Sequence, residues 1–153
     1  MELVDFIIKA KKQTYASGKP ARKLKDGFEE FVYEEGDYKY RDRYHARDPR
    51  PFGGEEVVWQ NGRAIWMMNY YGFMISTKVD SKAVYEFLRK AMSLVDEQRP
   101  FRGTSNLKEG DFEYIDSSEG DVNQFKGTER ILFKGKEVYR LEYHGGSVQW
   151  KQF

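Results

Sequence analysis

Large apolar side chains recur at the spacing of an amphipathic helix in two stretches of the chain, one near the start and one just after residue 80. Most of the intervening positions are charged or small. Asp80 and Ser81 precede the second stretch, and either one can cap a helix. The pattern predicts two helices, with apolar faces formed by Leu3, Phe6, Ile7 and Ala10 and by Val84, Phe87, Leu88, Ala91 and Leu94, and with Lys9, Lys11 and Lys12 on the polar side of the first.

Between and after these helices the pattern changes to the two-residue period of strands. Tyr38, Tyr40 and Tyr44 alternate with charged residues, as do Phe112 and Tyr114. Asn61-Gly62 and Lys134-Gly135 each separate two such runs, which predicts two hairpins with type I′ turns. A two-residue turn would place Val58 opposite Ile65 and Val57 opposite Trp66. By alternation, one inward face comprises Trp66, Met68, Tyr70, Tyr139, Leu141 and Tyr143, with Met67, Asn69 and Tyr71 pointing the other way.

The strand patterns also repeat along the chain. FGGEEVVWQNGRAIWMMNYYG (52–72) aligns without gaps to FKGTERILFKGKEVYRLEYHG (125–145). Upstream, EGDYKYRD (35–42) recurs as EGDFEYID (109–116), and FIIKA (6–10) recurs as FLRKA (87–91). Because the three blocks keep their order, we interpret the chain as a single domain, 1–153, made of two repeats, 1–79 and 80–153.

These elements predict an α+β fold. Each repeat would contribute one helix and about four antiparallel strands, with the two helices packed on a curved antiparallel sheet. One helix and four strands bury too little apolar surface to be stable alone, so we expect the repeats to share the sheet.

Composition limits the function. Twenty-six Lys and Arg against 25 Asp and Glu give a net charge of +1, which does not favour direct binding of nucleic acid or an acidic membrane. The absence of Cys excludes disulfides and thiolate metal sites, and no segment resembles a signal peptide or a membrane span. We therefore expect a cytoplasmic protein, and we interpret the basic stretch 9–25 as solvated surface.

Four carboxylates occupy equivalent positions in the two repeats: Asp42, Glu56, Asp116 and Glu129. They could bind a cation or act as acid and base, or they could bond to the backbone and to an Arg within their own half, as Glu129 would with Arg140 across the hairpin. Repetition in both halves favours the structural interpretation, but the sequence does not decide.

Signals of an enzyme are weak. His144, in YHGG, could act as a general base or contact a ligand, and the other histidine, His45, lies in a loop. No phosphate-binding loop, nucleophile elbow or metalloprotease motif is present. We predict no cofactor and no metal, and the sequence favours a noncatalytic protein over an enzyme.

The motifs KAKKQTYA, YEEGDYKYRD, GGEEVVWQNG, MNYYG, RPFRG and YHGG together resemble the uncharacterised domain family DUF5680. The resemblance implies a domain that occurs alone or behind a helix-turn-helix domain of the XRE repressor type, with no established activity. By that analogy it implies an effector-binding or dimerisation module. The sequence begins directly with the predicted first helix of the domain, so we do not expect it to contain the DNA-binding helix-turn-helix domain.

The leading hypothesis is a module that binds a small-molecule effector in an aromatic cleft between the two repeats. A hydrolase using His144 with Asp116 or Glu142, and a dimerisation module with Tyr71 and Trp59 at its interface, are the alternatives. The candidate ligand-binding residues are Tyr40, Glu56, Trp66, Asn69, Tyr70, Glu129, Tyr143 and His144.

Overall fold

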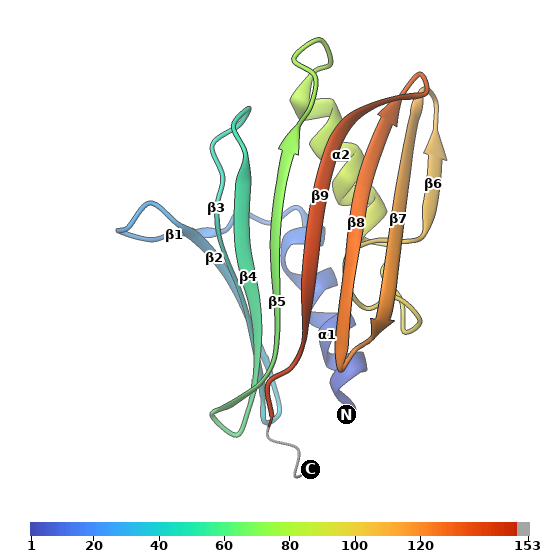
Figure 1. Cartoon of the computed structure of the whole chain (residues 1–153). Helices are drawn as coiled ribbons and strands as arrows, with labels where there is room; N and C mark the ends of the chain where they lie inside the picture. The colour runs from blue at the N-terminus through green and yellow to red at the C-terminus, as the bar shows by residue number, and fades with distance from the viewer. Residues whose placement is uncertain (150–153) are drawn as a thin grey trace.

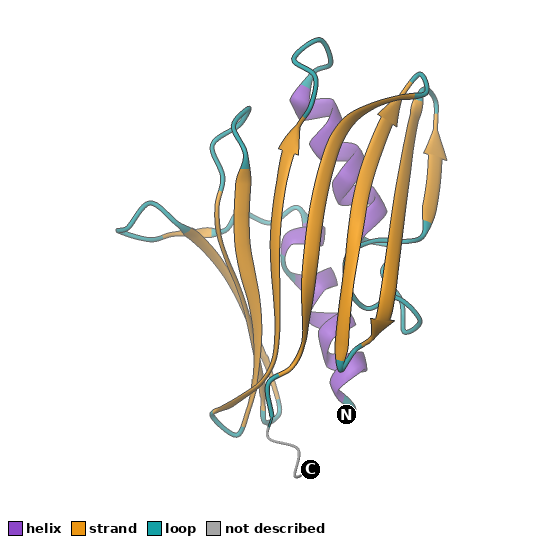
Figure 2. Cartoon of the chain, viewed as in Figure 1, coloured by secondary structure: helices purple, strands orange, loops and turns teal. Residues whose placement is uncertain are grey.

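The computed structural model describes residues 1–149 as one antiparallel sheet of nine strands with both helices on the same side of it (Figures 1 and 2). The first half of the chain contributes α1 (Leu3–Gln13), a short 3-10 helix η1 (Tyr15–Ser17), β1 (Arg22–Lys23), β2 (Glu29–Glu35), β3 (Tyr38–His45), β4 (Phe52–Gln60) and β5 (Arg63–Met74). The second contributes α2 (Ser81–Met92), β6 (Asn106–Glu109), β7 (Phe112–Asp121), β8 (Gln124–Phe133) and β9 (Lys136–Ser147).

The predicted fold class, repeated units of a helix and about four strands, is wrong: the structure is a single nine-stranded sheet with two helices. The strand order is β1-β2-β3-β4-β5-β9-β8-β7-β6, so the halves meet where β5 pairs with β9. The two-residue strand β1 adds a ninth strand at one edge. Its Arg22 and Lys23 are too short and too polar a run for strand periodicity to reveal.

The register across the centre of the sheet is symmetric in sequence. Tyr70 pairs with Tyr143, Trp66 with Ser147 and Met74 with Tyr139. Tyr70 thus faces the residue 73 positions later in the chain. Trp66 and Met74, four residues to either side of Tyr70, pair with Ser147 and Tyr139, four residues to either side of Tyr143. Any antiparallel pair of strands has a symmetric register, so the two-repeat interpretation stays a hypothesis.

Both predicted hairpin turns have the required backbone conformation. Asn61 and Gly62 have φ values of 48° and 77°, and Lys134 and Gly135 have 49° and 78°. The predicted register beyond the first turn is wrong by one residue, because Val58 pairs with Trp66 rather than with Ile65. The register shifts between Val58 and Trp59, leaving Ile65 without a partner on β4. Such a bulge is not visible in apolar alternation.

The inner face of the sheet forms the core with the helices. Trp66, Met68 and Tyr70 are buried there, as predicted from alternation, whereas Asn69 and Tyr71 are exposed on the outer face. Aromatic rings fill much of the space between the layers, for example Phe101 stacked on Phe125 with 4.3 Å between centroids. No helix among residues 1–149 has the length and apolarity needed to cross a membrane.

The helices agree with the sequence pattern except in two places. Asp80 caps α2 by accepting a hydrogen bond from the Lys82 backbone N–H, at 3.1 Å. Leu94 lies beyond the end of α2 and is exposed, so it does not belong to the buried face. Lys11, assigned to the polar side of the first helix, is completely buried. It follows Leu3 and Ile7 at intervals of four residues and therefore lies on the same stripe of α1.

Candidate ligand-binding pocket

The four repeated carboxylates all lie on the inner face of the sheet. Glu56 and Glu129 have no exposed surface, and Asp42 and Asp116 are 3% and 4% exposed. Asp42 pairs with Glu56 between β3 and β4, and Asp116 pairs with Glu129 between β7 and β8. Buried carboxylates are costly unless they are hydrogen-bonded or paired with a cation, so their partners determine what each one does.

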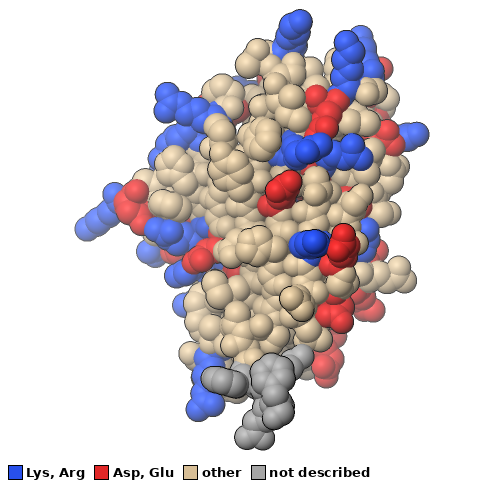
Figure 3. Space-filling model, in the orientation of Figure 1, with Lys and Arg blue, Asp and Glu red and all other residues tan. Residues whose placement is uncertain are grey.

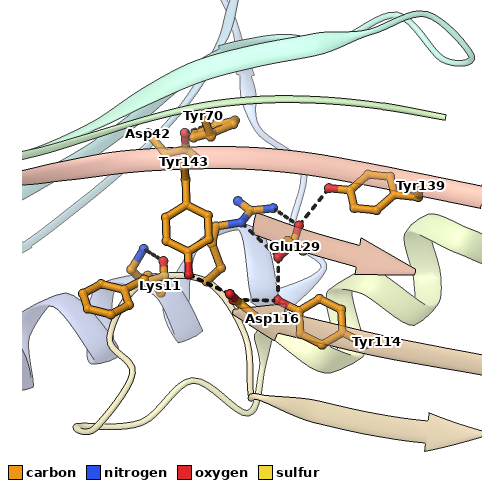
Figure 4. Close-up of polar contacts among 10 residues, drawn as sticks. Lys11, Asp42, Tyr70, Tyr114, Asp116, Glu129, Tyr139 and Tyr143 are labelled. Atoms are coloured by element: carbon orange, nitrogen blue, oxygen red, sulfur yellow. Dashed lines mark hydrogen bonds and ion pairs between the residues drawn. The ribbon is translucent and has the colours of Figure 1, made fainter. Parts of the chain in front are cut away.

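In the second half both buried carboxylates, Glu129 and Asp116, are well partnered. The Arg102 guanidinium donates two hydrogen bonds to Glu129, at 3.0 and 3.2 Å, and Tyr114 and Tyr139 donate two more, at 2.6 and 2.8 Å (Figure 4). This contradicts the predicted pairing of Glu129 with Arg140, which bonds to Glu137 instead.

Asp116 is equally well satisfied. Tyr143 donates to its Oδ1 at 2.7 Å, and the Tyr114 hydroxyl, whose single proton is shared with the closer Glu129, lies 3.2 Å from its Oδ2 (Figure 4). Arg99 lies beside it, with Nη2 3.1 Å from Oδ1. The second half thus places a guanidinium on each of its two buried carboxylates.

The first half is less complete. Lys11 Nζ donates to Glu56 Oε1 at 2.7 Å and to the Phe101 carbonyl at 2.5 Å, and Tyr40 also donates to Glu56 Oε1. Glu56 Oε2 is buried without a hydrogen bond. Among residues 1–149 the Asp42 side chain accepts one hydrogen bond, from Tyr70 at 2.5 Å (Figure 4), and no Lys or Arg lies within ion-pair distance of it.

Two glycines allow the tyrosines to reach these aspartates. Tyr70 on β5 is paired with Gly54, and its ring crosses that strand to reach Asp42 on β3. A Cβ atom at Gly54 would lie 2.6 Å from the Tyr70 hydroxyl. Tyr143 crosses Gly127 on β8 in the same way, and a Cβ there would lie 2.2 Å from its Cζ. Each of these glycines provides room for a buried ring.

Burial changes the ionisation of the network. Burial and the nearby Glu56 raise the pKa of Asp42 to about 7, against the opposing effect of the Tyr70 hydrogen bond. Burial and Glu129 raise the pKa of Asp116 to about 6. Burial also lowers the pKa of Lys11, although Glu56 favours its charged form. Asp42 therefore titrates close to neutral pH.

An open pocket of about 500 Å³ lies against Asp42. Its floor includes Asp42, Tyr70 and Arg102, and its walls come from β2, β3, the start of β4, η1 and α2. The lining thus combines residues 15–70 of the first half with residues 85–102 of the second. Its aromatic lining residues are Tyr15, Phe31, Tyr44, Phe52, Tyr70 and Tyr85.

The structure brings some predicted site residues together and separates others. Tyr70 lines the pocket, and four more belong to the buried polar network around it: Tyr40, Glu56, Glu129 and Tyr143. Trp66 is in the core, where its Nε1 donates to the Val122 carbonyl at 3.0 Å, and it does not line the pocket.

Asn69 and His144 pair across β5 and β9 and are exposed on the outer face. They line a larger, more open hollow of about 1070 Å³, whose ionisable residues, Glu119, Lys126 and His144, are all exposed. We favour the smaller pocket as the site because it has buried charged groups in its floor, which the outer hollow lacks.

The geometry also bears on the alternatives considered for the carboxylates. His144 is exposed on the outer face, whereas Asp116 is buried on the inner face, so the two do not form a catalytic pair. Within residues 1–149, no group of three or more His, Asp or Glu side chains is placed to hold a metal ion.

Several residues of the pocket and network escaped sequence reasoning. Lys11, Arg99 and Arg102 carry the buried positive charge, and Tyr44, Phe52 and Tyr85 line the pocket. Lys11 could have been found from its place on the apolar stripe of α1. The arginines lie in a loop with no periodicity, and only the tertiary structure shows that this loop enters the core.

Comparison with protein families gives one match, to a domain of unknown function (DUF5680), over residues 42–148. The chain belongs to this family. The predicted resemblance is thereby confirmed. The DUF5680 match begins at Asp42, so α1 and the pocket residues from Tyr15 to Phe31 precede the matched region. Searches of curated proteins and of solved structures found no match.

Proposed function

We propose that this DUF5680 chain is a noncatalytic module that binds a small-molecule effector in the pocket beside Asp42. The observation that carries the proposal is the Asp42 carboxylate itself, which is 3% exposed, accepts one hydrogen bond from described residues and lines an open pocket. A buried carboxylate with unused acceptor capacity is the kind of polar group that orients a ligand.

Size and lining support the proposal. A volume of about 500 Å³ lies within the usual range of roughly 300–1,000 Å³ for small-molecule sites. Aromatic and aliphatic side chains, including Tyr44, Phe52, Tyr85 and Leu88, surround the polar floor. The pocket draws its residues from both halves of the chain, so the effector would lie between the two proposed repeats.

Native mass spectrometry tests this function. The protein purified gently from its host should carry an excess mass that disappears on denaturation. Ala46→Trp should remove that mass, because Ala46 lines the pocket and an indole there would occupy it. Ala64→Trp, at an exposed position of β5, should keep it. An excess mass that survives Ala46→Trp in a folded protein would show that the pocket is not the binding site.

A second candidate function is dimerisation through the outer face of the sheet. Tyr71 is 57% exposed on the central strand β5, beside Phe73 at 6.2 Å between ring centroids. Uncharged side chains make up much of this face (Figure 3). Light scattering should then show a dimer that Tyr71→Glu converts to a monomer, and an unchanged mass for the variant would rule this interface out.

We propose that the protein acts in the cytoplasm, because the sequence has no Cys and therefore none of the disulfides common in secreted proteins. Of the two hydrolase pairings, His144 with Asp116 is not carried forward, because these residues lie on opposite faces of the sheet. His144 with Glu142, both exposed on the outer face of β9, stays a prediction.

A further inference from the structure

We propose that the ligand presents a hydrogen-bond-donating cation, an amine or a guanidinium, to the Asp42 carboxylate, with an apolar body lying between the sheet and α2. The inference rests on the proposed function and specifies the chemistry of the same pocket. Four observations carry it.

The first observation is that Asp116, the carboxylate equivalent to Asp42, is paired with an arginine of the chain. Asp116 occupies in EGDFEYID the place that Asp42 occupies in EGDYKYRD. Each accepts a hydrogen bond from one of the two central tyrosines, Tyr143 and Tyr70. Asp116 also has the Arg99 guanidinium at 3.1 Å, whereas Asp42 has no such partner among residues 1–149. The second half therefore shows that a guanidinium fits a carboxylate in this setting.

The second observation concerns the loop that delivers Arg99. The segment Arg99-Pro100-Phe101-Arg102 follows α2 as Lys19-Pro20-Ala21-Arg22 follows α1 and η1. Pro100, Phe101 and Arg102 are buried. In contrast, Lys19, Pro20 and Arg22 are exposed, and the segment runs along the pocket rim into β1. The chain thus buries this segment in the second half and leaves the corresponding segment of the first half exposed beside the pocket.

The third observation is charge balance. The inner face holds the four repeated carboxylates, and three cations contact them: Lys11 on Glu56, Arg102 on Glu129 and Arg99 on Asp116. Asp42 is the carboxylate of this set with no cation in contact within the described part of the chain. A ligand cation would supply the missing partner, and pairing a desolvated carboxylate is worth more than pairing an exposed one.

The fourth is the lining. Tyr44, Phe52 and Tyr85 line the pocket with aromatic rings, which attract organic cations through their faces. At the rim the exposed cations Lys19, Arg50 and Arg89 outnumber the exposed Asp48, so they disfavour a second positive charge at the outer end of the ligand. Arg102, in the floor, is already paired with Glu129. A ligand with one cationic end, an apolar middle and a neutral or anionic outer end fits this distribution.

Isothermal titration calorimetry with three probes of similar shape tests the inference: benzamidine, which is cationic, benzamide, which is neutral, and benzoate, which is anionic. The titrations are made at pH 8, above the pKa of about 7 at which Asp42 ionises. Benzamidine should bind at least about tenfold more tightly than benzamide or benzoate. Asp42→Asn should remove that preference, and Asp116→Asn, the matched change in the other half, should leave it intact.

The outcomes separate the inference from the proposed function. The inference that the ligand is a cation would be wrong in any of three cases: benzamidine and benzamide bind equally, benzoate binds more tightly than benzamidine, or Asp42→Asn leaves the benzamidine affinity unchanged. The inference would also be wrong if no probe binds although the protein carries a host-derived ligand that Ala46→Trp removes. In that case the proposed function, binding of a small molecule in this pocket, would still hold. Circular dichroism of both Asn variants establishes that they are folded.

Discussion

At the scale of single residues, the fold depends on a lysine with no exposed surface. Lys11 Nζ contacts Glu56 and the Phe101 carbonyl and lies 5.7 Å from the centroid of the Trp66 ring. It joins α1, β4 and the loop after α2 through one charged group. Removing one member of a buried ion pair costs more than the pair contributes, because the other charge is left without a partner.

Lys11→Met should therefore lower the free energy of unfolding by about 3–5 kcal/mol. The double variant Lys11→Met/Glu56→Gln should recover a large part of that loss, since it removes both charges. Lys12→Met, at an exposed position of the same helix, is the control and should change stability by less than about 0.5 kcal/mol. Urea denaturation measures all three, and purely additive effects of the two buried changes would contradict the pairing.

Asp42 should give stability a distinct dependence on pH. In the unfolded chain its carboxyl ionises near its ordinary pKa of 3.8, whereas in the fold it keeps its proton to about pH 7. Unfolding between these values releases a proton, so the free energy of unfolding falls as the pH rises. The loss at full ionisation is at most about 4 kcal/mol, at about 1.4 kcal/mol per pH unit.

Asp42→Asn removes this contribution. Relative to wild type, the variant should gain stability progressively from pH 4 to pH 8, as measured by urea denaturation at several pH values. Asp116, whose pKa is raised to about 6, keeps a dependence of the same sign in both proteins. A stability difference that is constant across this range would show that Asp42 ionises normally in the fold.

At the scale of elements, each half depends on a tyrosine that crosses a neighbouring strand. β8 can pass beneath the Tyr143 ring because position 127 is a glycine, and β4 passes beneath Tyr70 at Gly54. In each case the ring reaches an aspartate on the strand beyond, which ties three strands together through one side chain.

Gly127→Ala should destabilise the protein by about 2 kcal/mol or more, because the new methyl group would lie 2.2 Å from Tyr143 Cζ and must displace the ring. Ser117→Ala, at an exposed position on β7, should be nearly neutral. Thermal and urea unfolding report the difference. Equal stability of the two variants would mean that Tyr143 does not cross β8 as the structure has it.

At the scale of the whole molecule, the sheet is continuous from one half to the other. β5 and β9 pair over nine residue positions, from Trp66 with Ser147 to Met74 with Tyr139. Lys11 of the first half bonds to the Phe101 carbonyl of the second, and Arg102 contacts the pocket between them. Separating the halves would expose a central sheet edge and several buried charges.

We expect the chain to unfold as one cooperative unit for this reason. Tryptophan fluorescence and far-ultraviolet circular dichroism should give the same urea midpoint, within error. Two separated transitions, or probes with different midpoints, would show that the halves unfold independently and that the β5–β9 junction contributes little.

Much of the local structure was readable from the sequence. Helix spacing identified α2, and Asp80, one of the two predicted caps, is the one that caps it. The Asn61-Gly62 and Lys134-Gly135 turns have the expected backbone, and Trp66, Met68 and Tyr70 face the core. These features depend on residues close together in the chain, where periodicity and turn chemistry act directly. The DUF5680 resemblance was likewise contained in short motifs.

The candidate site was readable only in part. Alternation placed Tyr70 and Tyr143 on the inner face and repetition singled out Glu56 and Glu129, and these four and Tyr40 are all in or beside the polar network. It could not show that Trp66 is sealed in the core or that His144 lies on the other face from the pocket. Nor could it place Arg99 and Arg102, since no periodic pattern constrains a loop that enters the core.

The sequence by itself determined the positions of the turns and the inner and outer faces of the strands, because each follows from residues within one hairpin. Only the tertiary structure decided the ninth strand, the one-residue shift after Val58 and the contact of Lys11 with Glu56. It also decided that Pro100, Phe101 and Arg102 after α2 are buried while Lys19, Pro20 and Arg22 after α1 are exposed. That choice depends on how distant segments compete for the space beneath the sheet, and its result is a carboxylate, Asp42, that faces an open pocket.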